Sequence, residues 1–263
     1  MGEINFQKLR RFNLIMGLVH FLQAIAMLVL AFTVIQKIAE FSPVIRQFYI
    51  GYNTETQSLE TMSRDLFNLP FGFFVSLFLF VSAGAHALIS LPKKLNDIYN
   101  SQLEKGINKF RWFEYAISSS IMIVLIATLF GIYDIVSLML IFVLNATMNI
   151  FGLVMEQMNL GREKKTNWEP FIWGSIAGIA PWVAIFVYMF GTGNLDAVPW
   201  FVWAIIGSYF VAFNTFPINM VLQYKKVGKW KDYIYGERIY IILSLVAKSI
   251  LAWLVLFGAM QPS

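Results

Sequence analysis

The chain has 263 residues, of which 58% are hydrophobic and 13% are charged, with a net charge of +5. A soluble domain would be about 45–50% apolar and about 25% charged, so this composition excludes a soluble globular protein and indicates an integral membrane protein. There is no cysteine, which excludes disulfides. Spans consume most of the length, so we expect a single domain over residues 1–263. The positive charge does not indicate nucleic-acid binding, because its distribution follows membrane topology.

Seven apolar segments are long enough to cross a bilayer, since a spanning helix needs about 20 mostly apolar residues. They cover residues 12–36, 68–92, 109–130, 133–156, 168–191, 198–223 and 236–259. The link at 131–134 is very short, so the third and fourth spans should be antiparallel neighbours. The sequence therefore predicts an all-α membrane protein built as a seven-helix bundle.

The only long connection between spans covers residues 37–67. Its segment Val44–Tyr52 is rich in residues that favour strands and ends in a polar turn, which predicts a short β-hairpin. Long loops in compact proteins are often functional. The aromatic residues here favour an ordered lid or a contact surface.

Lysine and arginine are distributed unequally between the two sides of the predicted bundle. Sixteen lie before the first span or in the even-numbered links, whereas the other side has only Lys37, Arg46 and Arg64, all in the long loop. Positive residues favour the cytoplasmic side. We therefore expect a multi-pass protein of the cell membrane with a cytoplasmic N-terminus, an external C-terminus and an external hairpin.

Lys248 is the exception, because it lies near the middle of the last span. An ammonium at that depth costs about 2.5–3.5 kcal/mol on insertion scales. A lysine there can pair with a carboxylate, release its proton, or form an imine with a carbonyl ligand. Glu114 is the only acid well inside a span and is the natural partner, because desolvation penalises each charge alone.

Most other polar residues of the spans fall on the cytoplasmic side of Lys248, and the external side is almost entirely apolar. His20 and His86 lie in the cytoplasmic half. Helical spacing places several of these residues on common faces; the sets are Ser244 with Lys248, Arg111 with Glu114 and Ser118, Ser82 with His86 and Ser90, and Asn145 with Asn149, Gly152 and Glu156.

Each of these residues also has a purely structural interpretation. Lys248 could belong to a structural ion pair, and Glu114 could pair with Arg111 near the membrane surface. The two histidines could make hydrogen bonds between helices. The stripes of serine, asparagine and glycine are typical of helix packing, because small residues let spans approach closely.

The chain resembles the microbial rhodopsins, whose seventh span carries retinal on a lysine as a protonated Schiff base with a carboxylate of the third span as counter-ion. Its inverted orientation and long external first loop resemble the heliorhodopsins specifically. The motifs that carry the resemblance are Arg111-Trp-Phe-Glu-Tyr115 with Ser118, Pro181-Trp182, Phe213-Asn-Thr-Phe-Pro-Ile-Asn219 and Ser244-Leu-Val-Ala-Lys248. The resemblance covers essentially the whole chain.

The resemblance implies that Lys248 binds all-trans retinal covalently and that Glu114 is the counter-ion. Ser244 stands where pumping rhodopsins have a second carboxylate, and Val124–Ile126 stands where pumps place a proton donor. Further residues expected beside retinal are Tyr115, Ser118, Ser82, Asn145, Met148, Gly152, Trp182, Phe213 and Phe216. His20 and His86, with Arg111, would form a proton and water cluster.

The leading hypothesis is therefore a light-sensing photoreceptor with a slow photocycle that signals and does not pump ions, and is not an enzyme. Expected partners are the lipid bilayer, a second copy of the chain contacting through the hairpin, and an unknown cytoplasmic signalling protein. The alternatives are a light-driven proton or ion transporter or channel, and a retinal-free transporter or lipid-modifying enzyme. No metal-ligand spacing, phosphate loop or Ser/His/Asp set in the sequence supports the last of these.

Overall fold

The computed structural model describes residues 5–34, 42–161, 165–191 and 198–259, together with residues 193 and 196. Seven helices in this part are long and apolar enough to cross a membrane, which confirms the predicted bundle. They are α1 (Phe6–Val29, continued by a π-helical turn, Leu30–Val34), α3 (Phe71–Ser90), α5 (Lys109–Leu129), α6 (Ile135–Met158), α7 (Glu169–Phe190), α8 (Trp200–Tyr224) and α9 (Tyr233–Ala259).

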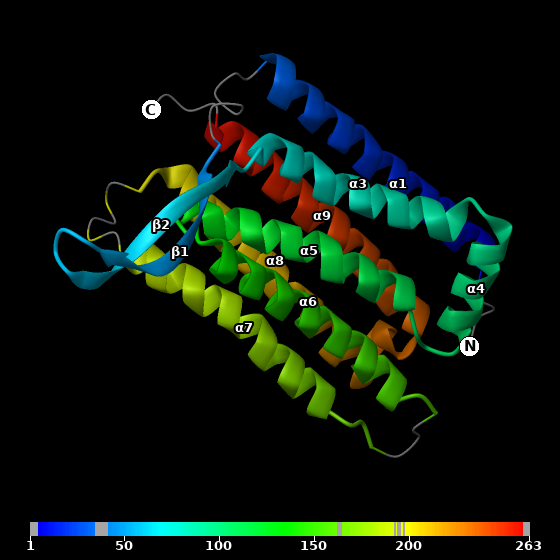
Figure 1. Cartoon of the computed structure of the whole chain (residues 1–263). Helices are drawn as coiled ribbons and strands as arrows, with labels where there is room; N and C mark the ends of the chain where they lie inside the picture. The colour runs from blue at the N-terminus through cyan, green and yellow to red at the C-terminus, as the bar shows by residue number, and fades with distance from the viewer. Residues whose placement is uncertain are drawn as a thin grey trace.

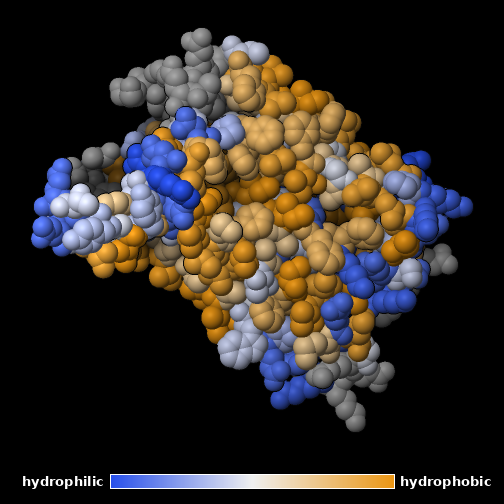
Figure 2. Space-filling model, viewed as in Figure 1, coloured by the Kyte–Doolittle hydropathy of each residue, from blue (hydrophilic) through white to orange (hydrophobic). Residues whose placement is uncertain are grey.

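The helices lie side by side with α5 at the centre of the bundle (Figure 1). Helix α5 is more buried than any other span described and contacts α3, α6 and α7, while α1 packs against α3 and α9, and α8 packs against α9. Figure 2 shows a broad hydrophobic surface along the bundle, with hydrophilic residues gathered toward its ends. This distribution is what a protein surrounded by lipid requires.

The two ends of the bundle differ. At one end, here called the basic end, α1, α5, α7 and α9 begin and α3, α6 and α8 finish. The other, the hairpin end, carries a two-stranded antiparallel sheet of β1 (Val44–Asn53) and β2 (Ser58–Asn68). The backbone N–H of Arg46 donates to the carbonyl of Tyr133 at 2.9 Å. The hairpin is therefore attached to the link between α5 and α6.

The predicted hairpin is confirmed, but both strands are longer than the segment that suggested it. One face of the sheet carries four apolar side chains that are all at least half exposed. Alternation along the strands puts them on the same side; they are Phe48, Ile50, Tyr52 and Leu59. The hairpin thus presents an uncovered apolar face.

At the basic end, an additional helix was not predicted. Helix α4 (Lys93–Glu104) occupies most of the link between the second and third spans. Its buried residues Asn96, Tyr99 and Leu103 have helical spacing, and Tyr99 and Leu103 pack with Leu9 and Ile241 of the bundle. A polar segment of this length has no hydropathy signal, so only its periodicity could have revealed it. A short 3₁₀ turn, Gly228–Lys231, precedes α9.

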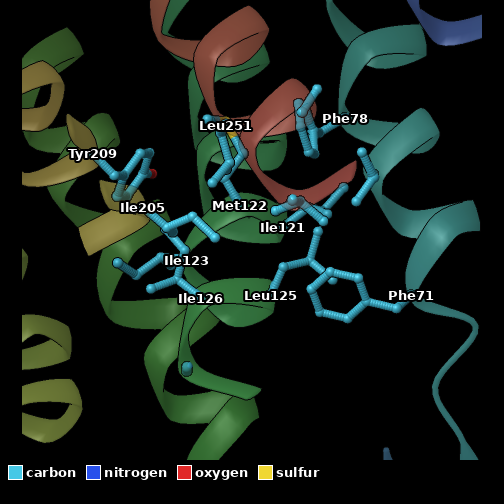
Figure 3. Packing of buried hydrophobic residues seen from close by; sticks show 14 of the residues in the cluster. Phe71, Phe78, Ile121, Met122, Ile123, Leu125, Ile126, Ile205, Tyr209 and Leu251 are labelled. Atoms are coloured by element: carbon cyan, nitrogen blue, oxygen red, sulfur yellow. The ribbon is translucent and has the colours of Figure 1, made fainter. Parts of the chain in front are cut away.

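The hairpin-end half of the bundle has an apolar core around α5. Figure 3 shows Ile123, Leu125 and Ile126 of α5 packed with Phe71 of α3 and Ile205 of α8. Lipid is as apolar as these side chains, so close packing is what holds this half together.

Candidate functional site

The structure brings Lys248 and Glu114 together inside the bundle. Lys248 Nζ lies 2.7 Å from Glu114 Oε1, and the two side chains are 4% and 8% exposed. Lys248 also donates to Ser244 Oγ at 2.9 Å, and Ser82 Oγ donates to Glu114 at 2.6 Å. Each charge is compensated by its opposite and by hydroxyl groups, which buried charges require. Helices α3, α5 and α9 meet at this pair.

Tyr115, the residue after Glu114, is fixed beside the pair. Its hydroxyl donates to the carbonyl oxygen of Tyr240 at 2.9 Å, and Lys248 Nζ lies 5.3 Å from the centre of its ring. At that distance the ring face attracts the ammonium. The aromatic wall next to Lys248 is thus anchored to the backbone of α9.

A cavity of about 510 Å³ extends from Lys248 and Ser244 into the bundle. This volume lies within the range of about 300–1,000 Å³ that is usual for small-molecule sites. Its wall is mainly aromatic and aliphatic. It includes five residues predicted from the sequence to lie near a ligand: Tyr115, Met148, Gly152, Phe213 and Phe216.

Two glycines leave room for the side chains of this wall. A Cβ atom on Gly152 would overlap the ring of Trp112, and one on Gly178 would overlap Met148. The indole of Trp112 cannot easily move aside, because its Nε1 donates to Glu156 at 2.7 Å. Glycine at 152 is therefore needed for α5 and α6 to approach closely here.

The cavity reaches the outer surface between α7 and α8. Two of its lining residues, Ile179 and Ile218, are 58% and 56% exposed. Toward the hairpin end, Trp182 lies against Phe213 and Tyr209, with ring centres 5.6 and 5.7 Å apart. Trp182 does not itself line the cavity but supports residues that do.

Three other predicted ligand contacts also lie outside this cavity wall: Ser118, Ser82 and Asn145. Ser118 is fully buried one turn after Glu114. Asn145 donates to Ser119 at 2.8 Å and Ser120 at 3.0 Å, which joins α6 to α5. Two residues that do line the cavity were not among the predicted ligand contacts: Ser119, and Asn149, which was named only as a member of the stripe with Asn145.

A second, polar cavity of about 40 Å³ lies on the other side of Glu114, toward the basic end. Its wall includes Ser82, His86, Arg111, Glu114 and Ser244. His20, which is fully buried, does not line it but stacks on His86 with ring centres 5.8 Å apart. Within the described residues, neither ring nitrogen of His20 has a hydrogen-bond partner. The two predicted histidines thus lie together beside the ion pair.

Arg111 pairs with Glu156 and Glu237, not with Glu114, so the proposed surface pair of Arg111 and Glu114 is not formed. All three side chains are at most 4% exposed. Asn108 holds both acids, because its backbone N–H donates to Glu156 at 2.9 Å and its Nδ2 donates to Glu237 at 2.7 Å. The guanidinium also lies 4.0 Å from the ring centre of Tyr240. This ion cluster closes the basic end of the polar region.

Glu237 was not among the predicted site residues. It stands at the start of the last predicted span, next to Arg238, which was counted with the link. The signal was its spacing from Ser244 and Lys248. Residues seven and eleven positions apart on a helix share a face, so Glu237 had to point the same way as Lys248. Arg111 was likewise counted among link residues, although it is buried in the first turn of α5.

Among the described residues, no group of three or more histidines and acids could hold a metal ion. The family model described as Heliorhodopsin matches residues 9–260 of the chain. No curated protein matches the sequence.

Proposed function

Because the chain belongs to the heliorhodopsin family, we propose that it is a light-sensing retinal photoreceptor that signals and does not transport ions. The family implies a retinal-binding rhodopsin. The observation that carries the rest is the buried Lys248–Glu114 pair at the end of a large aromatic cavity.

The residues of the cavity fit retinal. The space is large, apolar and bounded by flat rings, which suits a conjugated hydrocarbon chain, and its polar end holds an amine. Lys248 would hold retinal as a protonated Schiff base, and Glu114 would balance the charge. Bound retinal supplies absorption of visible light and a change of shape on isomerisation.

The chain itself determines where the proton at the Lys248 nitrogen can go. Glu114 and Ser244 both accept from the Lys248 nitrogen, and Ser82 donates to Glu114; these contacts would hold the proton in the dark. The neighbouring polar cavity and His86 lie toward the basic end, so the proton leaves in that direction. A slow rearrangement of the polar cluster would then carry the signal.

Net transport would require a polar route through the hairpin-end half as well. In the described part of that half, no lysine, arginine, histidine or acid is buried. Two of its buried hydroxyls, those of Ser76 and Thr128, donate to carbonyl oxygens of their own helices. Leu125 and Ile126 are fully buried where pumps need a proton donor. This asymmetry supports sensing over pumping.

We further propose that the chain is a single domain and not an enzyme, with a defined membrane topology and assembly. The basic end would face the cytoplasm, because positive residues favour that side, and would contact a signalling partner there. The hairpin would face outward. Its exposed apolar face is the proposed contact with a second copy in a homodimer.

The first test is reconstitution of the purified protein with all-trans retinal. A visible absorption band should form, should be lost in Lys248→Ala, and should persist in the exposed control Lys229→Ala. Colourless protein, or a band that survives in Lys248→Ala, would refute retinal attachment at this position.

The second test separates sensing from transport. Pigment oriented in sealed vesicles should give no sustained light-driven pH change. Pigment in patch-clamped cells should give no sustained light-driven current. A steady photocurrent that disappears in Lys248→Ala would establish the transporter alternative.

A further inference from the structure

Asn13 of α1 occupies a central place in the polar region that the function above does not use. It is 1% exposed. Its Nδ2 lies 3.2 Å from the carbonyl oxygen of Leu9 and 3.4 Å from the hydroxyl of Tyr99. Its Oδ1 lies 2.9 Å from Nδ1 of His86.

The partners of Asn13 determine which way its amide points. The carbonyl of Leu9 can only accept a hydrogen bond, so the NH₂ group must face it. The hydroxyl of Tyr99 donates to Glu237 at 3.4 Å and is therefore free to accept from the same NH₂ group. The amide oxygen must then face His86.

This orientation determines the tautomer of His86. An amide oxygen is only an acceptor, so the His86 Nδ1 opposite it must carry a hydrogen. A neutral imidazole has one ring hydrogen, so Nε2 is left with a free lone pair. No hydrogen bond to Nε2 is present among the described residues. His86 also lines the polar cavity that contains Glu114 and Ser244, and a space of about 40 Å³ exceeds the roughly 10–15 Å³ that one water needs.

The ring of His86 is held in place from two sides. His20 stacks on it at an interplanar angle of 18°. Gly17 lets α1 approach so closely that a Cβ atom there would lie 2.7 Å from His86 Cβ. A ring packed in this way cannot easily turn over to exchange its two nitrogens.

We propose that Asn13 is a positioning residue that holds His86 in the Nδ1–H tautomer, so that His86 Nε2 accepts the proton that leaves the Lys248 nitrogen. In this step the N–H bond at Lys248 breaks, its electron pair stays on that nitrogen, and a new N–H bond forms at Nε2. The positive charge moves to an imidazolium whose Nδ1–H still donates to Asn13. The transfer rests on the proposed photoreceptor function, whereas the tautomer does not.

Nitrogen-15 NMR of histidine-labelled protein tests the tautomer directly, because protonated and bare ring nitrogens have well-separated shifts. The chain has only two histidines, so His20→Gln assigns the signals. In dark protein at pH 8, with and without retinal, His86 should show a protonated Nδ1 and a bare Nε2. The ring hydrogen should move substantially to Nε2 in Asn13→Leu, which lacks the acceptor.

Two variants separate Asn13 from general disturbance of the pocket. Asn13→Asp keeps an acceptor oxygen, so Nδ1 should stay protonated. Tyr99→Phe removes the neighbouring hydroxyl but leaves the Leu9 carbonyl to orient the amide, so the tautomer should not change. A bare Nδ1 in the wild type, or a protonated Nδ1 that persists in Asn13→Leu, overturns the assignment. The wild-type spectrum alone can do so, even where a variant does not fold.

Flash photolysis tests the consequence for proton transfer. Hydrogen-bond partners that fix the tautomer of a metal-bound histidine typically contribute about 10–100-fold to metal affinity or activity. Taking the same scale for His86, deprotonation of the Lys248 nitrogen should slow by about that factor in Asn13→Leu. The deprotonation rate should return toward the wild-type rate in Asn13→Asp and should differ from it by less than about twofold in Tyr99→Phe. If deprotonation in all three variants is as fast as in the wild type, the transfer to His86 is overturned. If the wild-type protein forms no pigment, the photoreceptor function is overturned instead, and NMR of the retinal-free protein then decides the role of Asn13.

Discussion

Replacing Arg111 with methionine should destabilise the protein at neutral pH much more than at mildly acidic pH. The substitution leaves Glu156 and Glu237 buried, each 2% exposed, without their cation. Removing one partner of a buried pair typically costs about 3–5 kcal/mol. The cost of each unpaired acid has an upper limit, because the acid can take up a proton and become neutral. Neutralising a carboxyl of ordinary pKa, about 4.3, at pH 7 costs about 3.7 kcal/mol, since each pH unit is about 1.36 kcal/mol.

With two carboxylates, the expected loss at pH 7 is about 3–7 kcal/mol. The hydrogen bonds that Asn108, Trp112 and Tyr233 donate to the acids favour the lower part of that range. At pH 5 the limit falls to about 1 kcal/mol for each acid, because that pH lies only about 0.7 unit above the ordinary pKa of a carboxyl in the unfolded chain. The variant should therefore regain most of its electrostatic loss on acidification.

Thermal unfolding of the detergent-solubilised protein at pH 7 and pH 5 measures the effect. The gap in midpoint between wild type and Arg111→Met should shrink by more than half at pH 5. The triple variant with Glu156→Gln and Glu237→Gln should be more stable at pH 7 than the single variant, because it removes all three charges. Arg46→Met is the exposed control. Its pair with Asp65 is 46% and 64% exposed and should contribute less than about 1 kcal/mol.

Two results would refute this reasoning. One is a loss in Arg111→Met that is equal at both pH values, since packing and not charge would then account for it. The other is a triple variant no more stable than Arg111→Met, since the two acids would then not be the source of the cost.

Three further predictions concern the pigment and the assembly. Glu114→Gln should shift the visible band to longer wavelength, because a nearby negative charge no longer confines the positive charge to the Lys248 end; an unchanged spectrum would exclude a counter-ion role. Gly152→Ala should lower stability by about 1–3 kcal/mol and reduce pigment yield, as measured by thermal unfolding and absorbance, whereas Gly84→Ala, with no neighbour within 4 Å, should not. If the proposed dimer forms through the hairpin, Ile50→Lys should be monomeric in light-scattering measurements with an unchanged spectrum, whereas the wild type and Tyr49→Lys, on the opposite face of the hairpin, should be dimeric.

Hydropathy predicted the spans, and the energetic cost of burying a charge in lipid predicted the central residues of the site. Each span is long and apolar enough to be found by composition. The helices match the predicted segments within three residues at each described end, except that the first helix begins at Phe6, six residues before the predicted start. Lys248 was identifiable because an uncompensated ammonium in lipid is expensive. Its pairing with Glu114 could be anticipated for the same reason.

The remaining parts of the site depend on distances that a one-dimensional pattern does not contain. Periodicity says which residues share a face of a helix but not which faces meet. Asn145 and Trp182 had suitable depth, yet both lie behind the cavity wall. Asn13 and Glu237 matter only through contacts with three other helices, and α4 is too polar for hydropathy to detect.

The arrangement of the polar residues connects the two buried ionic centres to a surface helix. Glu114 and Arg111 lie one turn apart on α5, and the small cavity lies between their clusters. From His86 the contacts run through Asn13 to Tyr99 of α4, and from there to Glu237. Burial, with the Glu237 carboxylate, raises the pKa of Tyr99 well above its usual value, so its hydroxyl keeps its proton as a donor.

A positive charge that moves from the Lys248 nitrogen to His86 would therefore alter the field at groups that hold α4 against the bundle. Helix α4 is attached through only a few buried residues, of which Tyr99 is among the most buried. It lies at the basic end and presents most of its surface to solvent. A displacement of α4 would make a charge shift inside the bundle visible to the proposed signalling partner, and it needs no ion to cross the apolar half.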